Sequence, residues 1–257
     1  MATIARIFGC DSYAGHSTQL FGVECEVESV NTEVSWDFLG DKGIRITEDH
    51  SLRNNGREFL IGPATAANAL VSFNYLHSRG SWLKTEEKFS HRTSVHVHAN
   101  CQGRDDKVVR TAVLLYALFE EYFFRMVEPS RRDNIHCVPL TDTYLPSLYA
   151  SELVQLHNRW HKYTALNIKP LNTLGTIEFR HMQGHDDLNL LRQWLTIIDN
   201  LLSLADKVQV IKREHLDWAT LEQWFDHIFS GSNVFSLKSE MRQLCRNQLI
   251  DLKLSFL

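Results

Sequence analysis

Residues 174–187 read Leu-Gly-Thr-Ile-Glu-Phe-Arg-His-Met-Gln-Gly-His-Asp-Asp and predict a strand with two different faces. Successive side chains of a strand point to opposite sides of the sheet, so Glu178 and Arg180 share one polar face. Ile177 and Phe179 share the opposite face, which suits a protein core. The polar face can hold a cation with its carboxylate and a phosphate or carboxylate with its guanidinium group. Taken alone, the stretch is more simply interpreted as a solvated strand with a cross-strand ion pair, because strands that are polar on one side are common.

A second stretch, residues 19–30, alternates strictly between apolar and polar residues, which predicts another strand. Its polar face carries Glu24, Glu26 and Glu28. Carboxylates at this spacing repel one another, and a divalent cation would remove the repulsion. A solvated acidic edge strand is the alternative interpretation.

Two shorter stretches repeat this design. Residues 57–61 predict a strand with Glu58 opposite an apolar face. Residues 93–100 predict a strand with His96 and His98 opposite valines and an alanine. Two histidines on one strand face suit a metal ion or a phosphate, although half-buried histidines also serve as structural hydrogen-bonding groups.

The four polar faces would form one site if the strands belong to one sheet. If helices cover the apolar face, the polar residues converge on the other face. Such a face is too acidic for dry packing, because burying unpaired carboxylates is costly. Carboxylates with an imidazole suit Mg²⁺ or Mn²⁺, whereas zinc usually draws more histidine or cysteine. One arginine among the acids indicates a bridging phosphate oxygen, as in metal-assisted phosphoryl transfer.

Helical periodicity predicts the helices that would cover the apolar face. The predicted helices span residues 63–78, 104–128, 149–163, 188–205, 217–229 and 236–253. Asp186 or Asp187 is expected to cap the fourth of them. Gly62 and Pro63 are expected to end the strand before the first.

The long stretch 129–148 is expected to be an irregular loop over the site, with Arg131 and Arg132 solvated. We expect an α+β fold in one domain over residues 1–257. Residues 207–257 would form a helical extension at its C-terminal end.

Composition narrows the class of protein. With 27 basic and 31 acidic residues, the formal charge of −4 gives no broad positive field for nucleic acid or an anionic membrane. The five scattered cysteines lack a Cys-x-x-Cys pair, which argues against a disulfide framework and a structural zinc site. The first residues lack a signal-peptide core, and the longest apolar run, residues 112–119, is too short to span a bilayer. We expect a soluble, cytoplasmic protein.

Several motifs follow one another in a fixed order. They are Gly-Val-Glu-Cys-Glu at 22–26, Asp-His-Ser-Leu at 49–52, Gly-Arg-Glu-Phe at 56–59, Gly-Pro at 62–63, Val-His-Val-His at 95–98, Arg159, Asn167 and Gly-Thr-Ile-Glu-Phe-Arg at 175–180. With this ordered set, residues 22–205 resemble the putative amidoligase family. That family belongs to the carboxylate–amine ligase superfamily, with glutamine synthetase and γ-glutamylcysteine synthetase.

The resemblance implies a curved, largely antiparallel sheet with helices on one face and the active site on the other, as in the glutamine synthetase-like catalytic fold. It also implies binding of ATP and of two or more Mg²⁺ or Mn²⁺ ions. ATP would phosphorylate a small-molecule or peptide carboxylate, and an amine would displace the phosphate to give an amide. Some relatives form rings, but nothing in the sequence marks an interface, so an oligomer is left open.

The resemblance also implies roles for individual residues. The metal ligands would be Glu24, Glu26, Glu58, His96 and Glu178. The catalytic group would be Arg180, Glu178 and His98, with Arg180 neutralising the transferring phosphoryl group. Nucleotide, phosphate or substrate contacts would come from His98, Arg180, Arg159, Asn167, Asp49 and Ser51.

The chain departs from the family pattern at two places. Thr93 and Ser94 stand where the family has Cys-Gly, and Gly62 precedes Pro63 where the family has serine. Neither change removes an expected ligand, so activity is expected while the substrate pocket can differ. Relatives in bacteriophages and small bacterial gene clusters hint at modification of a peptide, a cell-wall component or a small metabolite.

Two other functions stay open at the level of sequence. A metal-dependent hydrolase also uses glutamate and histidine at a metal, but it would turn over without ATP. A degenerate binding protein would keep the fold without turnover, although decay would not be expected to spare every metal ligand and Arg180. The leading interpretation is an ATP-dependent, amide-forming ligase.

Overall fold

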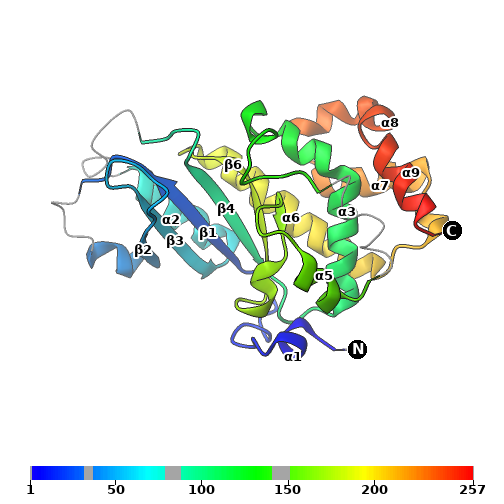
Figure 1. Ribbon diagram of the computed structural model, residues 1–257, viewed down its shortest axis with the longest axis horizontal. Helices are drawn as coiled ribbons and strands as arrows, with labels where there is room; N and C mark the ends of the chain where they lie inside the picture. The colour runs from blue at the N-terminus through cyan, green and yellow to red at the C-terminus, as the bar shows by residue number, and fades with distance from the viewer. Residues whose placement is uncertain (1, 32–36, 79–87, 141–150, 257) are drawn as a thin grey trace.

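Six strands form one open sheet in the described part of the chain, and each neighbouring pair is antiparallel. In their order across the sheet they are β2 (Ile44–Glu48), β3 (Arg57–Ala64), β1 (Phe21–Val27), β4 (Ser94–Asn100), β6 (Thr176–Gln183) and β5 (Leu166–Asn167). The computed structural model describes residues 2–31, 37–78, 88–140 and 151–256. The fold is α+β, as the sequence predicts (Figure 1).

The predicted alternation of the strands is present. On β1, Val23 and Cys25 are each 1 % exposed, whereas Glu24 between them lies on the opposite face. Phe59 on β3 and Val97 on β4 are fully buried in the same way. One face of the sheet therefore packs into the core and the other carries the polar residues.

The register of the strands places the polar residues in two adjacent rows. One row reads, from β2 to β4, Arg45, Leu60, Glu24 and His96. The next row reads, from β1 to β5, Gly22, His98, Glu178 and Asn167. Directly paired residues on one face of a sheet have Cβ atoms about 4.5–5.5 Å apart. Residues from distant parts of the chain are thus neighbours on the sheet.

A β-bulge interrupts the pairing of β4 with β6. Val97 pairs with Phe179, but Val95 pairs with Met182, so β6 holds one extra residue in this interval. Both Met182 and the preceding His181 are fully buried. Alternation along the sequence does not reveal this extra residue.

His181 joins a buried polar chain on the core side of the sheet. Its Nε2 lies 2.8 Å from the Tyr116 hydroxyl, which donates to Glu120 Oε1 at 2.6 Å. The backbone N–H of Leu140 donates to the same oxygen at 2.6 Å. Burial lowers the pKa of His181 well below its usual value, so the ring is neutral.

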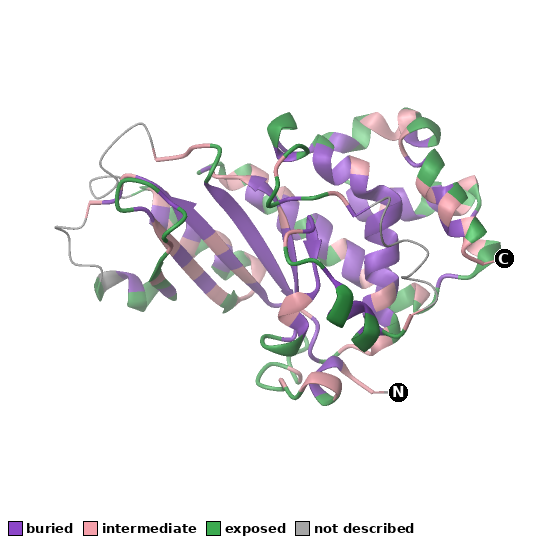
Figure 2. Ribbon diagram, in the orientation of Figure 1, coloured by how far each residue is buried: buried purple, intermediate pink, exposed green. Residues whose placement is uncertain are grey.

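Helices cover the apolar face and extend the core beyond it (Figures 1 and 2). They are α1 (Ile4–Phe8), α2 (Ala66–Ser78), α3 (Asp106–Arg125), α5 (Leu153–Arg159), α6 (Leu188–Val208), α7 (Trp218–Phe229), α8 (Met241–Leu244) and α9 (Arg246–Leu254). Helix α2 packs on β1 and β3, and α6 packs on α2 and α3. Asp187 caps α6, as predicted, by accepting from the N–H groups of Asn189 and Leu190.

The prediction of one helix over residues 236–253 is wrong. A 3₁₀ segment, η5 (Asn233–Glu240), leads into α8, and Cys245 separates α8 from α9 with φ −104° and ψ 5°. Met241, Cys245 and Leu249 are all buried, so the residues on both sides of the break pack into the core.

Two other predicted boundaries also move. Helix α5 ends at Arg159, because Trp160 turns to an extended conformation and its buried indole donates to the carbonyl of Leu166 at 2.9 Å. Gly62 and Pro63 lie within β3 instead of ending it, since the antiparallel pairing with β1 continues to Ala64.

The C-terminal helices pack against the helices that cover the sheet. Helix α7 contacts α6, and α8 and α9 contact α3. The Phe225 ring lies 4.7 Å from that of Tyr122 on α3. Among the described residues, no helix combines the length and the apolar character needed to cross a membrane.

A half-buried histidine on α2 with two buried ring nitrogens predicts an acid-sensitive fold. The two ring nitrogens of His77 are buried without a hydrogen-bond partner among the described residues, and burial lowers the pKa of His77 to about 3. The unfolded chain takes up this proton below about pH 6.5 and the folded chain does not, so stability falls as the pH decreases from there towards 3. Between pH 7 and pH 5, we predict that the free energy of unfolding falls by about 2 kcal/mol less in His77→Phe than in the parent protein. Urea unfolding at the two pH values measures this difference.

The exposed His50 provides the control for this measurement. His50→Gln should leave the difference between the two pH values unchanged. The same pH dependence in His77→Phe and in the parent protein would contradict the prediction.

Candidate functional site

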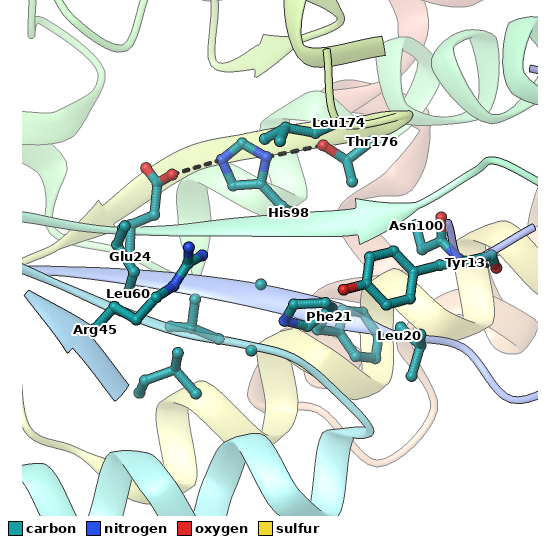
Figure 3. Close-up of a pocket in the computed structure, with 15 residues that line it drawn as sticks. Tyr13, Leu20, Phe21, Glu24, Arg45, Leu60, His98, Asn100, Leu174 and Thr176 are labelled. Atoms are coloured by element: carbon teal, nitrogen blue, oxygen red, sulfur yellow. Dashed lines mark hydrogen bonds and ion pairs between the residues drawn. The ribbon is translucent and has the colours of Figure 1, made fainter. Parts of the chain in front are cut away.

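Three side chains from three strands meet on the polar face of the sheet, and we call them the ligand triad. Glu24 on β1, His98 on β4 and Glu178 on β6 each place a ligand atom within 4.8 Å of the others. Glu24 Oε1 lies 3.0 Å from His98 Nε2, and Figure 3 shows the two side chains pointing toward each other. Thr176 Oγ1, 2.9 Å from His98 Nδ1, fixes the ring. The buried Nε2 faces the Glu24 carboxylate, so a neutral His98 ring can share a cation with Glu24.

His96 lies beside the ligand triad and is enclosed by acceptors. Its Nδ1 lies 3.3 Å from Glu24 Oε2 and 3.4 Å from Glu178 Oε1. Its Nε2 lies 2.7 Å from Ser94 Oγ, which donates to Glu26 Oε2 at 2.6 Å. With the one hydroxyl proton given to Glu26, Nε2 must carry a proton, and the Nδ1 lone pair of a neutral ring faces two carboxylates. A proton on Nδ1 or a cation in the triad would relieve this repulsion.

Arg180 and Asn167 hold Glu178 from two sides. Arg180 Nη1 donates to Glu178 Oε1, and Asn167 Nδ2 donates to Glu178 Oε2 at 2.7 Å. Arg180 also donates through Nε to the carbonyl of His136 at 3.1 Å. The carboxylate and the guanidinium group are therefore fixed relative to each other before any ligand binds.

Glu26 and Glu58 form an acidic pair next to the ligand triad, where β1 and β3 are in register. Glu58 Oε2 accepts from the hydroxyl of Thr47 at 3.0 Å. Burial, together with repulsion from Glu24 and Glu26, nevertheless raises the pKa of Glu58 to about 7. These two acids could supply further oxygen ligands, although their ligand atoms are not part of the triad.

The ligand triad concentrates charge. Burial alone would raise the pKa of Glu24, but hydrogen bonds and positive charge from His96 and His98 hold it well below its usual value. Burial would likewise lower the pKa of His98, but Glu24 and Glu178 raise it. The carboxylate of Glu24 is thus ionised at neutral pH and paired with imidazole in place of solvent.

Two cavities with different linings adjoin this group of residues. The first, of about 340 Å³, begins at Glu24 and His98 and extends to Tyr13 and Asn100 (Figure 3). Most of its walls are apolar, with Leu20, Phe21, Leu60 and Leu174 among them. We call it the apolar cavity.

The second, of about 260 Å³, is the polar cavity. Its lining includes Glu26, Ser94, Arg92, Arg131 and Arg180, together with Asp49 and Ser51. The backbone N–H of Ser51 donates to Asp49 Oδ1 at 2.8 Å, and its carbonyl accepts from Arg92 at 3.1 Å.

The structure gathers most of the residues that the motifs indicate. Those on or next to the ligand triad are Glu24, Glu26, Glu58, His96, His98, Asn167, Glu178 and Arg180, and Asp49 and Ser51 line the polar cavity. Arg159 is exposed at the end of α5. In the described part of the chain it neither bonds to the triad nor lines either cavity.

Comparison with known proteins agrees with this geometry. Residues 75–201 match the family described as "putative amidoligase enzyme". Over these residues, which we call the amidoligase segment, the chain is similar to that family. No curated protein matches the chain.

The amidoligase segment contains β4, β5 and β6, and with them His98, Glu178 and Arg180. Glu24 lies before the matched segment and reaches it only through the pairing of β1 with β4. The family indicates a ligase, and the oxygen and imidazole donors of the ligand triad suit a hard divalent cation.

Arg131 corrects one prediction about the amidoligase segment. It was expected to be solvated, but it is 4 % exposed and donates to the carbonyls of Arg180 and His181 at 2.7 and 2.8 Å. These carbonyls lie at the β-bulge of β6, where regular pairing is interrupted. Arg132, by contrast, has a side chain that is 47 % exposed and pairs with Glu121.

Other residues that line the cavities escaped the motif analysis. They are Tyr13, Arg45 and Arg92. Each lies in a loop or on an edge strand, where neither periodicity nor a short motif marks it. Only the folded chain brings them to the walls of the two cavities.

The two neighbouring arginines provide a direct test of this correction. We predict that Arg131→Met lowers the free energy of unfolding by about 2–4 kcal/mol, because two buried carbonyls lose charge-assisted hydrogen bonds. Arg132→Met should change it by less than about 1 kcal/mol, because exposed ion pairs contribute little. Chemical denaturation of the two variants and the parent checks this, and equal effects would contradict it.

Proposed function

We propose that this amidoligase-family protein is an ATP-dependent carboxylate–amine ligase. A small-molecule or peptide carboxylate would attack the γ-phosphorus of ATP, with ADP leaving, to form an acyl phosphate. An amine would then attack the acyl carbon and lose a proton, with phosphate leaving, to give the amide. The observation that supports this proposal is the ligand triad with Arg180 beside it: Glu24 and His98 line one cavity, and Arg180 lines a second cavity of different character.

Glu24, His98 and Glu178 would hold Mg²⁺ or Mn²⁺, and Glu26, Glu58 and His96 could contribute to a second ion. A bound divalent cation would neutralise phosphate oxygens during transfer. The fit rests on the buried Nε2 of His98, which lies 3.0 Å from Glu24 Oε1, and on the two carboxylates around Nδ1 of His96.

Arg180 would contact the transferring phosphoryl group. Its guanidinium group is preorganised by Glu178 and by the carbonyl of His136, so it needs no rearrangement when charge develops. Asn167 would keep Glu178 oriented by occupying its second oxygen. Asp49 and Ser51 would contact the substrate from the wall of the polar cavity.

The sheet, with helices on one face and the site on the other, is consistent with a glutamine synthetase-like catalytic fold. We also propose that the reaction takes place in the cytoplasm, where ATP is available. The acid and the amine remain to be identified by screening, because specificity depends on the shape of the cavities.

We predict that a non-hydrolysable ATP analogue binds only with Mg²⁺ or Mn²⁺ present, as measured by calorimetric titration. Glu24→Gln and Glu178→Gln should each weaken this binding by about tenfold or more, because each removes a charged metal ligand. Glu48→Gln is the matched control, since Glu48 is an exposed acid paired with Arg57. Metal-independent binding, or triad variants that bind like the parent, would contradict the proposal.

A second prediction concerns Arg180 and separates phosphoryl transfer from nucleotide binding. Arg180→Met should reduce phosphate release with a productive acid and amine by about 10²–10³, as expected for loss of a preorganised charge at the transition state. Its affinity for the ATP analogue should fall much less. Turnover of any substrate without ATP would instead identify a hydrolase and refute the ligase assignment.

A further inference from the structure

Different site residues line the two cavities, and this difference suggests which substrate each cavity binds. Glu24 and His98 of the ligand triad line the apolar cavity. Arg180 and Glu26 line the polar cavity. A nucleotide needs its phosphates at the metal ligands and its base in a less polar place, and the apolar cavity provides both.

Gly22 makes room for a ligand on the floor of the apolar cavity. It pairs with His98 on the same face of the sheet, one row from Glu24. A Cβ atom at this position would lie 3.5 Å from His98 Cβ, so a longer side chain would occupy the space next to the ligand triad. The missing side chain leaves this part of the sheet open.

Arg45 provides positive charge where the phosphates would lie. It begins the first row across the sheet, in which Leu60 separates it from Glu24. Figure 3 shows its side chain extending from β2 toward Glu24, along the wall of the apolar cavity. No hydrogen bond or ion pair engages its guanidinium group within the described residues, and the residue is exposed. A guanidinium group in this state can bind phosphate oxygens.

Tyr13 provides an aromatic surface at the other end of the apolar cavity. Its backbone is fixed, because its N–H donates to Gln102 Oε1 at 2.6 Å and its carbonyl accepts from Asn100 at 3.2 Å. Gln102 also donates to the carbonyl of Leu174 at 2.9 Å, so one buried amide holds two walls of the cavity. Tyr13 is 37 % exposed and its ring lies 5.9 Å from that of His16, so the ring stays accessible and can stack on a planar ligand.

We propose that the apolar cavity is the nucleotide site, with the base on Tyr13 and the phosphates between Arg45 and the ligand triad. This inference rests on the proposed function and assigns binding roles to two residues that no motif marks. His98 and Asn100 are two residues apart on β4, which separates their Cα atoms by about 6.6–6.8 Å. The cavity thus runs along the strands from the phosphate end to the base end, and the polar cavity stays available for the acid.

The test compares variants at the two cavities by calorimetric titration with a non-hydrolysable ATP analogue in Mg²⁺. Arg45→Gln should weaken binding by about tenfold, since a hydrogen bond to a charged group is lost. Tyr13→Ala should weaken it by about fivefold or more through loss of stacking, whereas Tyr13→Phe should bind like the parent. Arg92→Gln removes an exposed arginine at the polar cavity and should leave the affinity unchanged. Thermal unfolding of each variant confirms that the fold is intact.

The outcomes separate this inference from the function on which it rests. An analogue that binds the parent, and loses affinity in Arg92→Gln but not in Arg45→Gln, would place the nucleotide in the polar cavity and overturn the inference while the ligase proposal stands. Unchanged affinity in Arg45→Gln and Tyr13→Ala would also overturn it. No binding to the parent under any metal condition would refute the proposed function and this inference together.

Discussion

Pairing of β1 with β4 and of β4 with β6 is the constraint on which the site depends. It places carboxylates from two distant strands around the imidazole groups of His96 and His98. Packed side by side in a half-buried place, these carboxylates would repel one another without positive charge between them. The helices under the sheet stabilise the register, because a slip of one residue would exchange the polar and apolar faces. The same core that stabilises the fold therefore also fixes the spacing of the charges.

Much of this arrangement follows from the sequence. Strict alternation along β1 and β4 separates residues that pack from residues that can bind, and the apolar period of α6 predicts the helix beneath. The convergence of Glu24, His98 and Glu178 was predictable from the strand faces, although the order of the strands was not. The amidoligase match covers β4 and β6, which carry His98 and Glu178, but not β1 with Glu24.

The remaining features depend on tertiary contacts that no local pattern records. Arg131 is buried because the β-bulge of β6 leaves two carbonyls for it, and alternation cannot reveal a bulge. Helix α5 ends early because Trp160 finds an acceptor on Leu166, and the break at Cys245 reflects packing on α3. Arg45 is an ordinary charged residue of an edge strand until the sheet is assembled. Residues 141–150, which hold the end of the expected loop and the first two residues of the helix expected over 149–163, lie outside the described part of the chain.

Strand β6 and the segment that follows α3 are joined by arginine hydrogen bonds in both directions. Arg131 donates to carbonyls of β6, and Arg180 of β6 donates back to the carbonyl of His136. An insertion or deletion between Arg131 and His136 would misalign these hydrogen bonds and displace the guanidinium group of Arg180 at the site. The length of the segment from Arg131 to His136 is therefore set by the same hydrogen bonds that position the Arg180 guanidinium group.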